Sequence, residues 1–512
     1  MKHSFKTATL AALTGLAFHG SVLAEPWIDT SNIYLRADLQ LLADKGHLNI
    51  PLTTFPIMWA DVGRVFKQIQ PEQLDEESKN AYWHIAQHMR RAGRDQHYVE
   101  MNFASNDRRY TSFGEEYRDD NNAQGTLTYM GERLAARLSV TVVNDPEDDE
   151  EARIDDSYIA AFWGNWVFSA GAYSRWWGPG WDTNLALTNN ARPMPGLAIT
   201  RKTSEPFKFP FTEWHIPWTA TTFMNQFEDD RHVPNTLLWG FRMTIKPMPN
   251  LELGVTRLAQ WAGDDRPSDL STFWDVLKGD DNCVLSAAEC EKQGLEPGNQ
   301  LAGADLRYSN VLFDLPFSIY TQVIGEDGNS KNSGLIGQKV WTHGIDTQFR
   351  ALDHYWRAYL EYTDSYTDCT PASLGEEDSR YGVGDCLYEH HIYRSGMRYE
   401  RRVLGNLYEN DAETYVLGFI SQLNELSSWE VKFRYLDLNY DNSDWYPNNP
   451  DLGNTLTKIN EEVLMVSVKY QLRQGHFKYT IGGDYSQSSF IEPGVDDSSK
   501  PNIYFNVEYN LK

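Results

Sequence analysis

The sequence predicts an all-β fold, a transmembrane antiparallel β-barrel of about eighteen strands, with a small N-terminal α-helical bundle at its periplasmic end. Three observations predict it. The chain opens with an export signal, its hydrophobic period is two from about residue 97 onward, and short turns alternate with long polar loops. The alternative is a soluble β-sandwich or β-propeller whose sheets have one solvent-exposed face. Long strands with a charged polar face favour the barrel.

Residues 1–24 have the pattern of a secretory signal peptide. Lys2 and Lys6 precede an apolar stretch, and the small-residue end Val22-Leu23-Ala24 predicts cleavage after Ala24. The apolar stretch is too short to span a bilayer, and no later run of about 18 apolar residues exists. We therefore expect an exported protein that lies in the outer membrane of a Gram-negative bacterium.

Residues 25–95 are predicted to form the periplasmic helical bundle. The stretches "SNIYLRADLQLLADKG", "PIMWADVGRVF" and "DEESKNAYWHIAQHMRRAG" each repeat apolar residues at helical spacing. The first follows a Ser/Asn cap and ends at Gly46, and the third ends on two arginines and Gly93. Three short helices of this kind must pack on a larger unit.

Residues 96–512 are predicted to form the barrel. The stretches "TLLWGFRMTIK", "FKYTIGGDY" and "NIYFNVEYNLK" alternate apolar with polar residues. The polar face is predicted to line the lumen and carries Arg242, Lys246, Lys432, Arg434, Lys469 and Lys478, with Glu430 and Asp484. Short turns occur at 131–132, 164–165 and 472–475, and long loops at 106–123, 144–155, 262–300 and 440–460.

The strand count has a parity conflict. Roughly nineteen segments qualify as strands, but bacterial barrels close with an even number. The conflict lies within 365–412, where only 389–402 resembles a strand although an even number of crossings is required. Either a second strand lies within 365–388, or another segment such as 197–204 is not a full strand.

Charge and motifs exclude several classes of function. The formal net charge of −26 argues against binding to nucleic acid. The sequence has no G-x-S-x-G, H-E-x-x-H, P-loop or dinucleotide fingerprint, so we expect no enzyme, no cofactor and no metal centre. A hydrolase site in the barrel wall has no motif to mark it. The acidic stretch 144–156 is either a solvated loop or a site of divalent-cation capture, and its spacing fits no EF-hand.

The four cysteines fall into two local pairs within polar segments. An exported protein meets an oxidising compartment, which predicts the disulfides Cys283–Cys290 and Cys369–Cys386. Free thiols are the alternative.

The stretch "RWWGPGWDTNLALTNNARPMPG" (175–196) combines large rings, amides and cations. Tryptophan faces stack on sugar rings, amides bond hydroxyl groups, and arginine binds carboxylates in bidentate fashion. The composition therefore suits an acidic glycan, whereas a plug that fills the lumen and binds nothing is an equal alternative. The candidate polysaccharide-binding residues are Arg175, Trp176, Trp177, Trp181, Asp182, Asn190 and Arg192.

The same stretch, continued to Arg201, resembles the Wzi family of capsule-assembly outer-membrane proteins. Further matching pieces are "YLRADLQLLADKGHLNIPLTTFPIMWADV", "STFWDVLKGDDN" followed by "EPGNQLAGADLRY", and "YRSGMRYERRVLG". Together they cover nearly the whole mature chain. One departure is the C-terminal Leu511-Lys512, which is not the terminal aromatic residue usual in such barrels.

The resemblance implies an eighteen-stranded barrel, a helical bundle that closes the periplasmic end, and loops that narrow the outer end. It also implies lectin-like retention of capsular polysaccharide at the cell surface. We expect a monomer whose partners are this polysaccharide and the outer-membrane lipids, including lipopolysaccharide. The competing hypothesis is a channel for small acidic saccharides.

Overall fold

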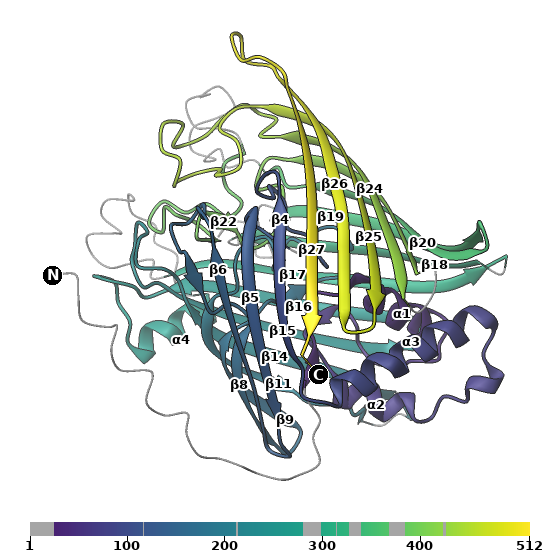
Figure 1. Ribbon diagram of the computed structural model, residues 1–512. Helices are drawn as coiled ribbons and strands as arrows, with labels where there is room; N and C mark the ends of the chain where they lie inside the picture. Colours follow the sequence, from purple (N-terminus) through teal and green to yellow (C-terminus); the bar gives the residue numbers. More distant parts are fainter. Residues whose placement is uncertain are drawn as a thin grey trace.

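A computed structural model describes residues 25–511 except for 116, 211–212, 280–297, 314, 327–338, 368–383 and 423–425. Its centre is a closed antiparallel β-barrel, in which the last strand pairs with the first barrel strand and Val507 lies opposite Met101. Figure 1 shows the helices α1, α2 and α3 gathered at one end of this barrel, close to the C-terminus.

The barrel is built from nineteen segments in the order of the chain. They are β4 (His97–Ala104), β5 (Asn121–Met130), β6 (Leu134–Val143), β7 (Ala152–Arg153), β8 (Ser157–Trp163), β9 (Trp166–Ala172), β11 (Pro195–Arg201), β14 (Trp218–Gln226), β15 (Leu237–Met248), β16 (Leu251–Trp261), β17 (Gly298–Leu312), β18 (Leu315–Glu326), β19 (Lys339–Ala351), β20 (His354–Asp364), β23 (Glu413–Gln422), β24 (Ser427–Leu438), β25 (Glu461–Gln474), β26 (Phe477–Phe490) and β27 (Ser498–Asn510). Since β7 and β8 both pair with β6, they count as one strand, and the barrel has 18 strands as predicted.

The predicted period of two is confirmed on the barrel wall. In β15, Arg242 and Lys246 point inward and are buried, whereas Trp239 and Phe241 point outward. Exposed apolar side chains such as Leu464 and Ile503 lie on the outer surface of later strands. An apolar exterior around a polar interior is the arrangement of a transmembrane β-barrel.

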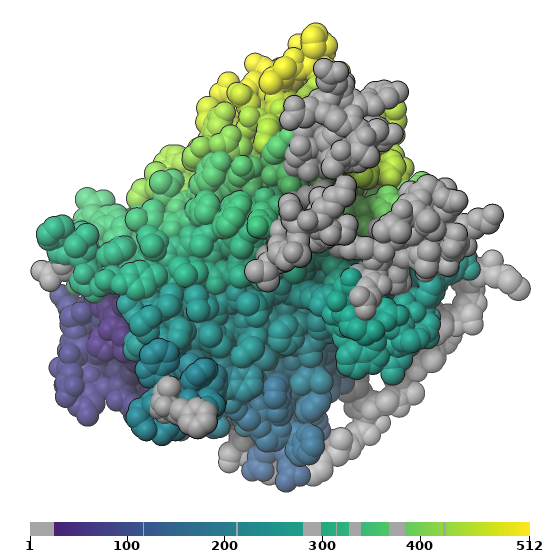
Figure 2. Space-filling model, turned by 180° about the vertical axis from the view of Figure 1, so that it is seen from behind, coloured from purple at the N-terminus to yellow at the C-terminus, as the bar shows by residue number. Residues whose placement is uncertain are grey.

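The two ends of the barrel differ in their connections. Two- and three-residue turns join β5 to β6, β8 to β9, β15 to β16, β19 to β20 and β25 to β26. The described parts of loops 105–120, 365–412 and 439–460 lie at the other end. The helices lie at the short-turn end, since Glu76 contacts Arg350 and Tyr355, which flank the β19–β20 turn. Figure 2 shows these purple helices at one edge of the wall.

The structure resolves the parity conflict. Residues 389–402 do not form a barrel strand, because β20 pairs directly with β23, with Glu361 opposite Val416. The segment instead carries a small hairpin of β21 (Arg398–Tyr399) and β22 (Arg402–Val403). Nearly all side chains from 384 to 399 are buried, so the segment has no exposed apolar face to turn toward lipid.

The N-terminal region forms the three predicted helices and reaches into the barrel. They are α1 (Ile33–Asp44), α2 (Trp59–Phe66) and α3 (Glu76–Ala92), with a short 3-10 helix at Pro71–Gln73. Asn32 caps α1, and eleven of its twelve residues are buried against α3 and the inner faces of β18 and β23. Helix α3 ends at Ala92, and the first barrel strand, β4, begins at His97.

Further short elements complete the described structure. Two-residue strands form the pairs β1 (Trp27–Ile28) with β3 (Ile57–Met58), β2 (Thr54–Phe55) with β10 (Trp176–Trp177), and β12 (Phe207–Lys208) with β13 (His215–Ile216). Helix α4 (Leu270–Lys278) follows β16, and its Phe273 ring contacts the outward-facing Trp239. Within the described ranges, no helix combines the length and the apolar character needed to cross a membrane.

Candidate functional site

The segment 173–194 folds into the barrel between β9 and β11, and we call it the plug. Its Trp176–Trp177 pairs as β10 with β2 of the N-terminal region. The Gly178 N–H donates to the Thr53 carbonyl at 3.0 Å, and the Arg36 guanidinium of α1 donates to the Gly180 carbonyl at 2.7 Å. The plug and the helical bundle therefore meet inside the barrel.

Gly178 is required where the plug turns. Its φ is +143°, and an added Cβ would lie 2.2 Å from Asn184 Oδ1. Only glycine adopts this backbone conformation without strain and leaves room for the neighbouring amide. The glycines and prolines of the stretch thus shape a tightly packed segment.

Trp181 of the plug is completely enclosed, with 0% of its surface exposed. Its indole lies between the guanidinium groups of Arg36 and Arg357, which are 4.3 and 4.9 Å from the ring. Tyr359 lies nearly parallel to it at 6.1 Å, and the indole N–H donates to Asp346 at 3.2 Å. Every face of this ring contacts protein.

The other two tryptophans of the plug are equally buried. The Trp176 N–H donates to the Gly180 carbonyl at 3.0 Å, and the edge of the ring meets Phe113 at 5.4 Å. Trp177 packs against Phe223 of β14 at 5.2 Å. Neither ring has a free face for a sugar.

Asp182 lies at the centre of a buried ion-pair network. Its carboxylate accepts from Arg434 at 2.6 Å, lies 3.7 Å from Lys432 Nζ, and also contacts the Tyr408 hydroxyl. Burial alone would raise the pKa of Asp182, but Arg434 and Lys432 outweigh burial and lower it. Asp182 is therefore an ionised anchor that binds the plug to β24.

The remaining candidate residues also have internal partners. Arg192 binds Asp155 through two bonds of 2.9 and 3.1 Å and Asp148 through one of 2.7 Å. Arg175 stacks on Tyr173 and Phe223, and Asn190 donates to the Val403 carbonyl.

The structure places these seven candidate residues inside the barrel and not on an exposed surface. Their side chains, from Arg175 to Arg192, are at least nine-tenths buried and contact protein groups. The rings, amides and cations pack largely against one another and against the wall within the lumen, which is the arrangement of a plug. In this conformation none of the three indole rings can stack on a sugar.

The lumen-facing charges predicted from the strands point inward and are buried or nearly so. Arg242 binds Asp305 at 2.6 and 2.9 Å. Lys432 binds Glu115 of loop 105–120 at 2.8 Å and Glu430 at 3.0 Å, and Lys469 binds Glu430 at 2.6 Å. Wall cations thus pair with acids from the wall, the plug and the loops.

A second network joins the bundle to the wall. Asp44 at the end of α1 accepts from Arg307 at 3.2 Å and from Arg357 at 3.4 Å. Both arginines also contact Asp346, which accepts the Trp181 N–H. The pKa of Asp44 is lowered because these arginines outweigh the effect of its burial. Bundle, plug and wall therefore share one set of charges.

The acidic loop 144–156 is held by arginines. Asp148 binds Arg153 at 2.6 Å and Arg192 at 2.7 Å, and Glu147 binds Arg402 at 2.8 Å. The loop is neither fully solvated nor, among the residues described, a cluster of cation ligands.

Outside the plug, an aromatic and cationic surface lies on the long-loop end. We call it the rim patch and define it as Arg394, Arg401, Trp445, Tyr446 and Asn449. Trp445 is 40% exposed, and Arg401 reaches across to Asp451 at 2.9 Å with both side chains about half exposed. The Asn449 N–H donates to the Tyr446 carbonyl at 3.0 Å. Burial raises the pKa of Tyr446, and the nearby positive charge of Arg394 opposes this rise.

From the sequence, Trp445, Tyr446 and Asn449 were assigned to the long polar loop 440–460, and Arg394 and Arg401 to the strand-like segment 389–402. A signal was present, because "SDWYPNNP" (443–450) repeats the combination of rings, amides and prolines found in the plug. Amino-acid composition did not distinguish the buried plug stretch 175–196 from the exposed stretch 443–450.

The disulfide predictions concern residues that lie mostly outside the described part of the chain. Cys283, Cys290 and Cys369 are not among the described residues, so both pairings stay predictions. Cys386 is buried, with its sulfur 3.5 Å from the Thr367 carbonyl oxygen.

Comparisons with known proteins agree with this architecture. An Escherichia coli structure, described as Wzi, an outer membrane protein involved in group 1 capsule assembly and a carbohydrate-binding β-barrel, matches with a TM-score of 0.78 at 22% identity. That match covers 94% of this chain and 99% of the other, and it shows the fold.

A Klebsiella pneumoniae protein, described as an uncharacterized 55.8 kDa protein in the cps region, is 30% identical over 320 residues. The match covers 60% of this chain and 61% of that protein, so the chain spans less than two thirds of the relative's length. The family model of capsule assembly protein Wzi matches residues 90–499, which is most of the sequence. The chain therefore belongs to the capsule assembly protein Wzi family.

Proposed function

We propose that this chain is an outer-membrane protein that retains capsular polysaccharide at the cell surface through its outer loops, without enzymatic activity. The observation that carries the proposal is the burial of the plug rings, beside which a polar cavity lined by Arg137, Lys478 and Glu508 lies in the lumen. The three plug tryptophans are fully buried, so a glycan meets the long-loop end of the protein and not its interior. Short turns face the periplasm in such barrels, which places the long loops outside the cell.

The rim patch offers the groups that a polysaccharide needs. The exposed Trp445 ring can stack on the apolar face of a sugar, and Asn449, whose N–H donates to the neighbouring Tyr446 carbonyl, can bond hydroxyl groups. Arg394 and Arg401 supply guanidinium groups, which bind carboxylates in bidentate fashion. These two cations support an acidic polysaccharide as the ligand.

The remaining features follow the same proposal. The signal peptide is cleaved after Ala24, and the apolar exterior of the strands contacts outer-membrane lipids, including lipopolysaccharide. The protein acts as a monomer.

A channel for small acidic saccharides is the competing function. It requires an open path, whereas plug, bundle and wall charges are paired with one another across the described lumen. Near silence in a planar bilayer supports surface retention, and a sustained open-state current supports the channel.

The test is capsule retention in a strain that lacks the protein and is complemented with single variants. Trp445→Ala and Arg401→Ala should release polysaccharide into the medium while the barrel stays heat-modifiable on a gel. Trp83→Ala is the matched control, because Trp83 is 48% exposed but lies on α3 at the opposite end.

A further variant addresses the other prominent loop. Trp274 of α4 is 55% exposed and belongs to loop 262–297. If Trp274→Ala releases the capsule and Trp445→Ala does not, the glycan site lies in that loop and the rim patch is wrong.

A further inference from the structure

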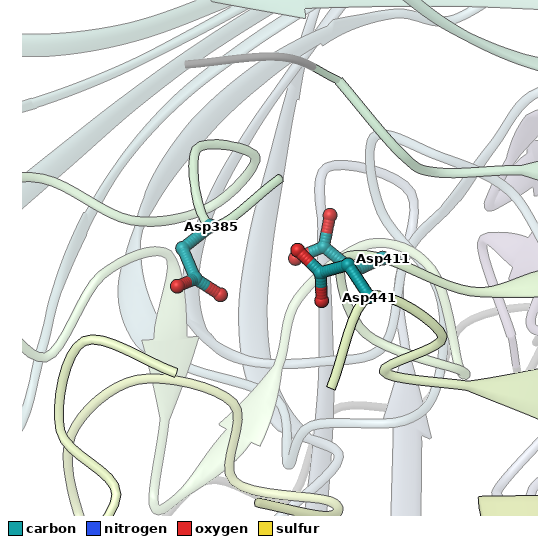
Figure 3. Close-up of side chains that lie close together, drawn as sticks. All are labelled: Asp385, Asp411 and Asp441. Atoms are coloured by element: carbon teal, nitrogen blue, oxygen red, sulfur yellow. The ribbon is translucent and has the colours of Figure 1, made fainter. Parts of the chain in front are cut away.

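Three aspartates meet at the outer end of the barrel, away from the plug. Asp385 and Asp411 lie in loop 365–412, and Asp441 lies in loop 439–460. One carboxylate oxygen from each lies within 4.8 Å of the other two. Figure 3 shows the three carboxylates turned toward a common space from separate segments of the chain.

Asp385 and Asp411 are both buried, and Asp385 accepts a hydrogen bond from the Ser443 hydroxyl at 3.2 Å, whereas Asp411 has no partner among the residues described. Asp411 is 1% exposed, and neither of its carboxylate oxygens accepts a hydrogen bond from the residues described. Oδ2 of Asp441 is likewise buried and unbonded. A buried ionised carboxylate that lacks both a donor and a cation is costly, so Asp411 is neutralised either by a proton or by a bound cation.

Nearby cations are committed elsewhere. Lys458 binds Asp444 at 3.1 Å, and Arg398 binds Glu389 and Glu409 at 2.5 and 2.7 Å. None of the three aspartates forms an ion pair with any cation in the described ranges.

Mutual repulsion and burial act on all three groups. Burial, with Asp441, Asp444 and Glu389 nearby, raises the pKa of Asp385 to about 7. Burial and Asp444 raise the pKa of Asp441 to about 6, and burial with Asp441 and Asp385 raises that of Asp411 further above its usual range. A bound cation would oppose these shifts, because it favours the ionised form of each carboxylate.

The backbone leaves space for an ion at the same point. Gly384 has φ +124°, and a Cβ added there would lie 2.5 Å from Asp411 Oδ1 and 2.6 Å from Asp441 Oδ2. A glycine thus keeps the space between the carboxylates open. Opposite ligands of Ca²⁺ lie about 5 Å apart, so all three oxygens fit within one coordination sphere.

We propose that Asp385, Asp411 and Asp441 form a Ca²⁺ site that ties the two outer loops together. Ca²⁺ takes six to eight oxygen ligands with flexible geometry, which suits carboxylates supplied by separate loop segments. Asp441 is only half buried and provides the entry side. The ion joins Asp385 and Asp411, near the two ends of segment 384–412, to loop 439–460, which carries Trp445.

The test measures ion binding without any polysaccharide, so it is independent of the proposed function. The purified full-length mature protein in detergent is stripped with EDTA and titrated with Ca²⁺ by calorimetry. Tb³⁺ luminescence gives a second readout, because the Tyr366 and Tyr440 rings lie 5.0 Å apart beside the site and can sensitise a bound lanthanide.

We expect one Ca²⁺ per wild-type chain. Asp411→Asn and Gly384→Ala should each weaken binding by at least about tenfold, since one removes a ligand charge and the other fills the space. Asp451→Asn is the matched control, because this exposed aspartate lies in the same loop but pairs with Arg401. Its affinity should equal that of the wild type.

Folding is checked separately in EDTA by heat-modifiability. Asp411→Asn should be at least as well folded as the wild type there, because it removes a buried unpaired charge. No Ca²⁺ binding by the wild type at about millimolar concentration, or equal binding by wild type and Asp411→Asn, would overturn the proposal.

Discussion

Replacing Trp181 by alanine should destabilise the barrel by about 4 kcal/mol. A buried tryptophan removes about 150–250 Å² from water, which is worth about 4–6 kcal/mol at about 25 cal/mol per Å². Measured truncations of buried large rings cost about 3–5 kcal/mol. The variant also loses the contacts of the indole with Arg36 and Arg357 and its bond to Asp346.

The assay is equilibrium unfolding in urea of the barrel refolded into lipid vesicles, followed by tryptophan fluorescence and by mobility on unheated gels. Trp445→Ala is the control, because an exposed rim residue should change the free energy of unfolding by less than about 0.5 kcal/mol. If Trp181→Ala costs less than about 1 kcal/mol and yet releases the capsule, Trp181 belongs to the glycan site and the plug assignment is wrong.

Three further predictions concern the plug, the bundle and the cysteines. Asp182→Ala should cost about 3–5 kcal/mol, because it leaves Arg434 buried without its partner. Because folding lowers the pKa of Asp182, its ionised carboxylate stabilises the folded state above the unfolded pKa of about 3.9. This stabilisation is lost as the pH falls through the folded pKa, and acid denaturation of the wild type and of Asp182→Ala measures the loss. Deletion of 28–93 should open a sustained current in planar bilayers, and unchanged conductance of a folded variant would contradict the role of the bundle. Peptide mapping without reduction should find Cys369 joined to Cys386, a link worth about 3 kcal/mol, and free thiols would refute it.

Most of the fold follows from local patterns. Strands such as β15 and β27 alternate strictly, so the sequence predicts both their existence and the face that lines the lumen. Helix α1 begins after the N-cap residue Asn32 and ends just before Gly46, and both signals are visible in the sequence. Periodicity failed at 389–402, where both faces of the segment are buried and alternation does not mark a membrane wall.

The site was harder to predict because composition does not encode burial. Trp181 and Trp445 both lie among asparagines, prolines and charged residues, yet one ring is enclosed by wall residues and the other faces solvent. The difference depends on Arg357, Tyr359 and Asp346, which come from strands far along the chain. Only the tertiary structure brings these residues together.

The charges that fill the lumen have a consequence for assembly. Early acids such as Asp44, Glu115 and Asp182 find their cations on strands translated much later, among them Arg357, Lys432 and Arg434. The seam between β27 and β4 closes the wall. Until β20 and β24 are in place, these acids have no such cations to pair with. Because each pair joins residues far apart in the chain, assembly depends on long-range contacts, which slow folding.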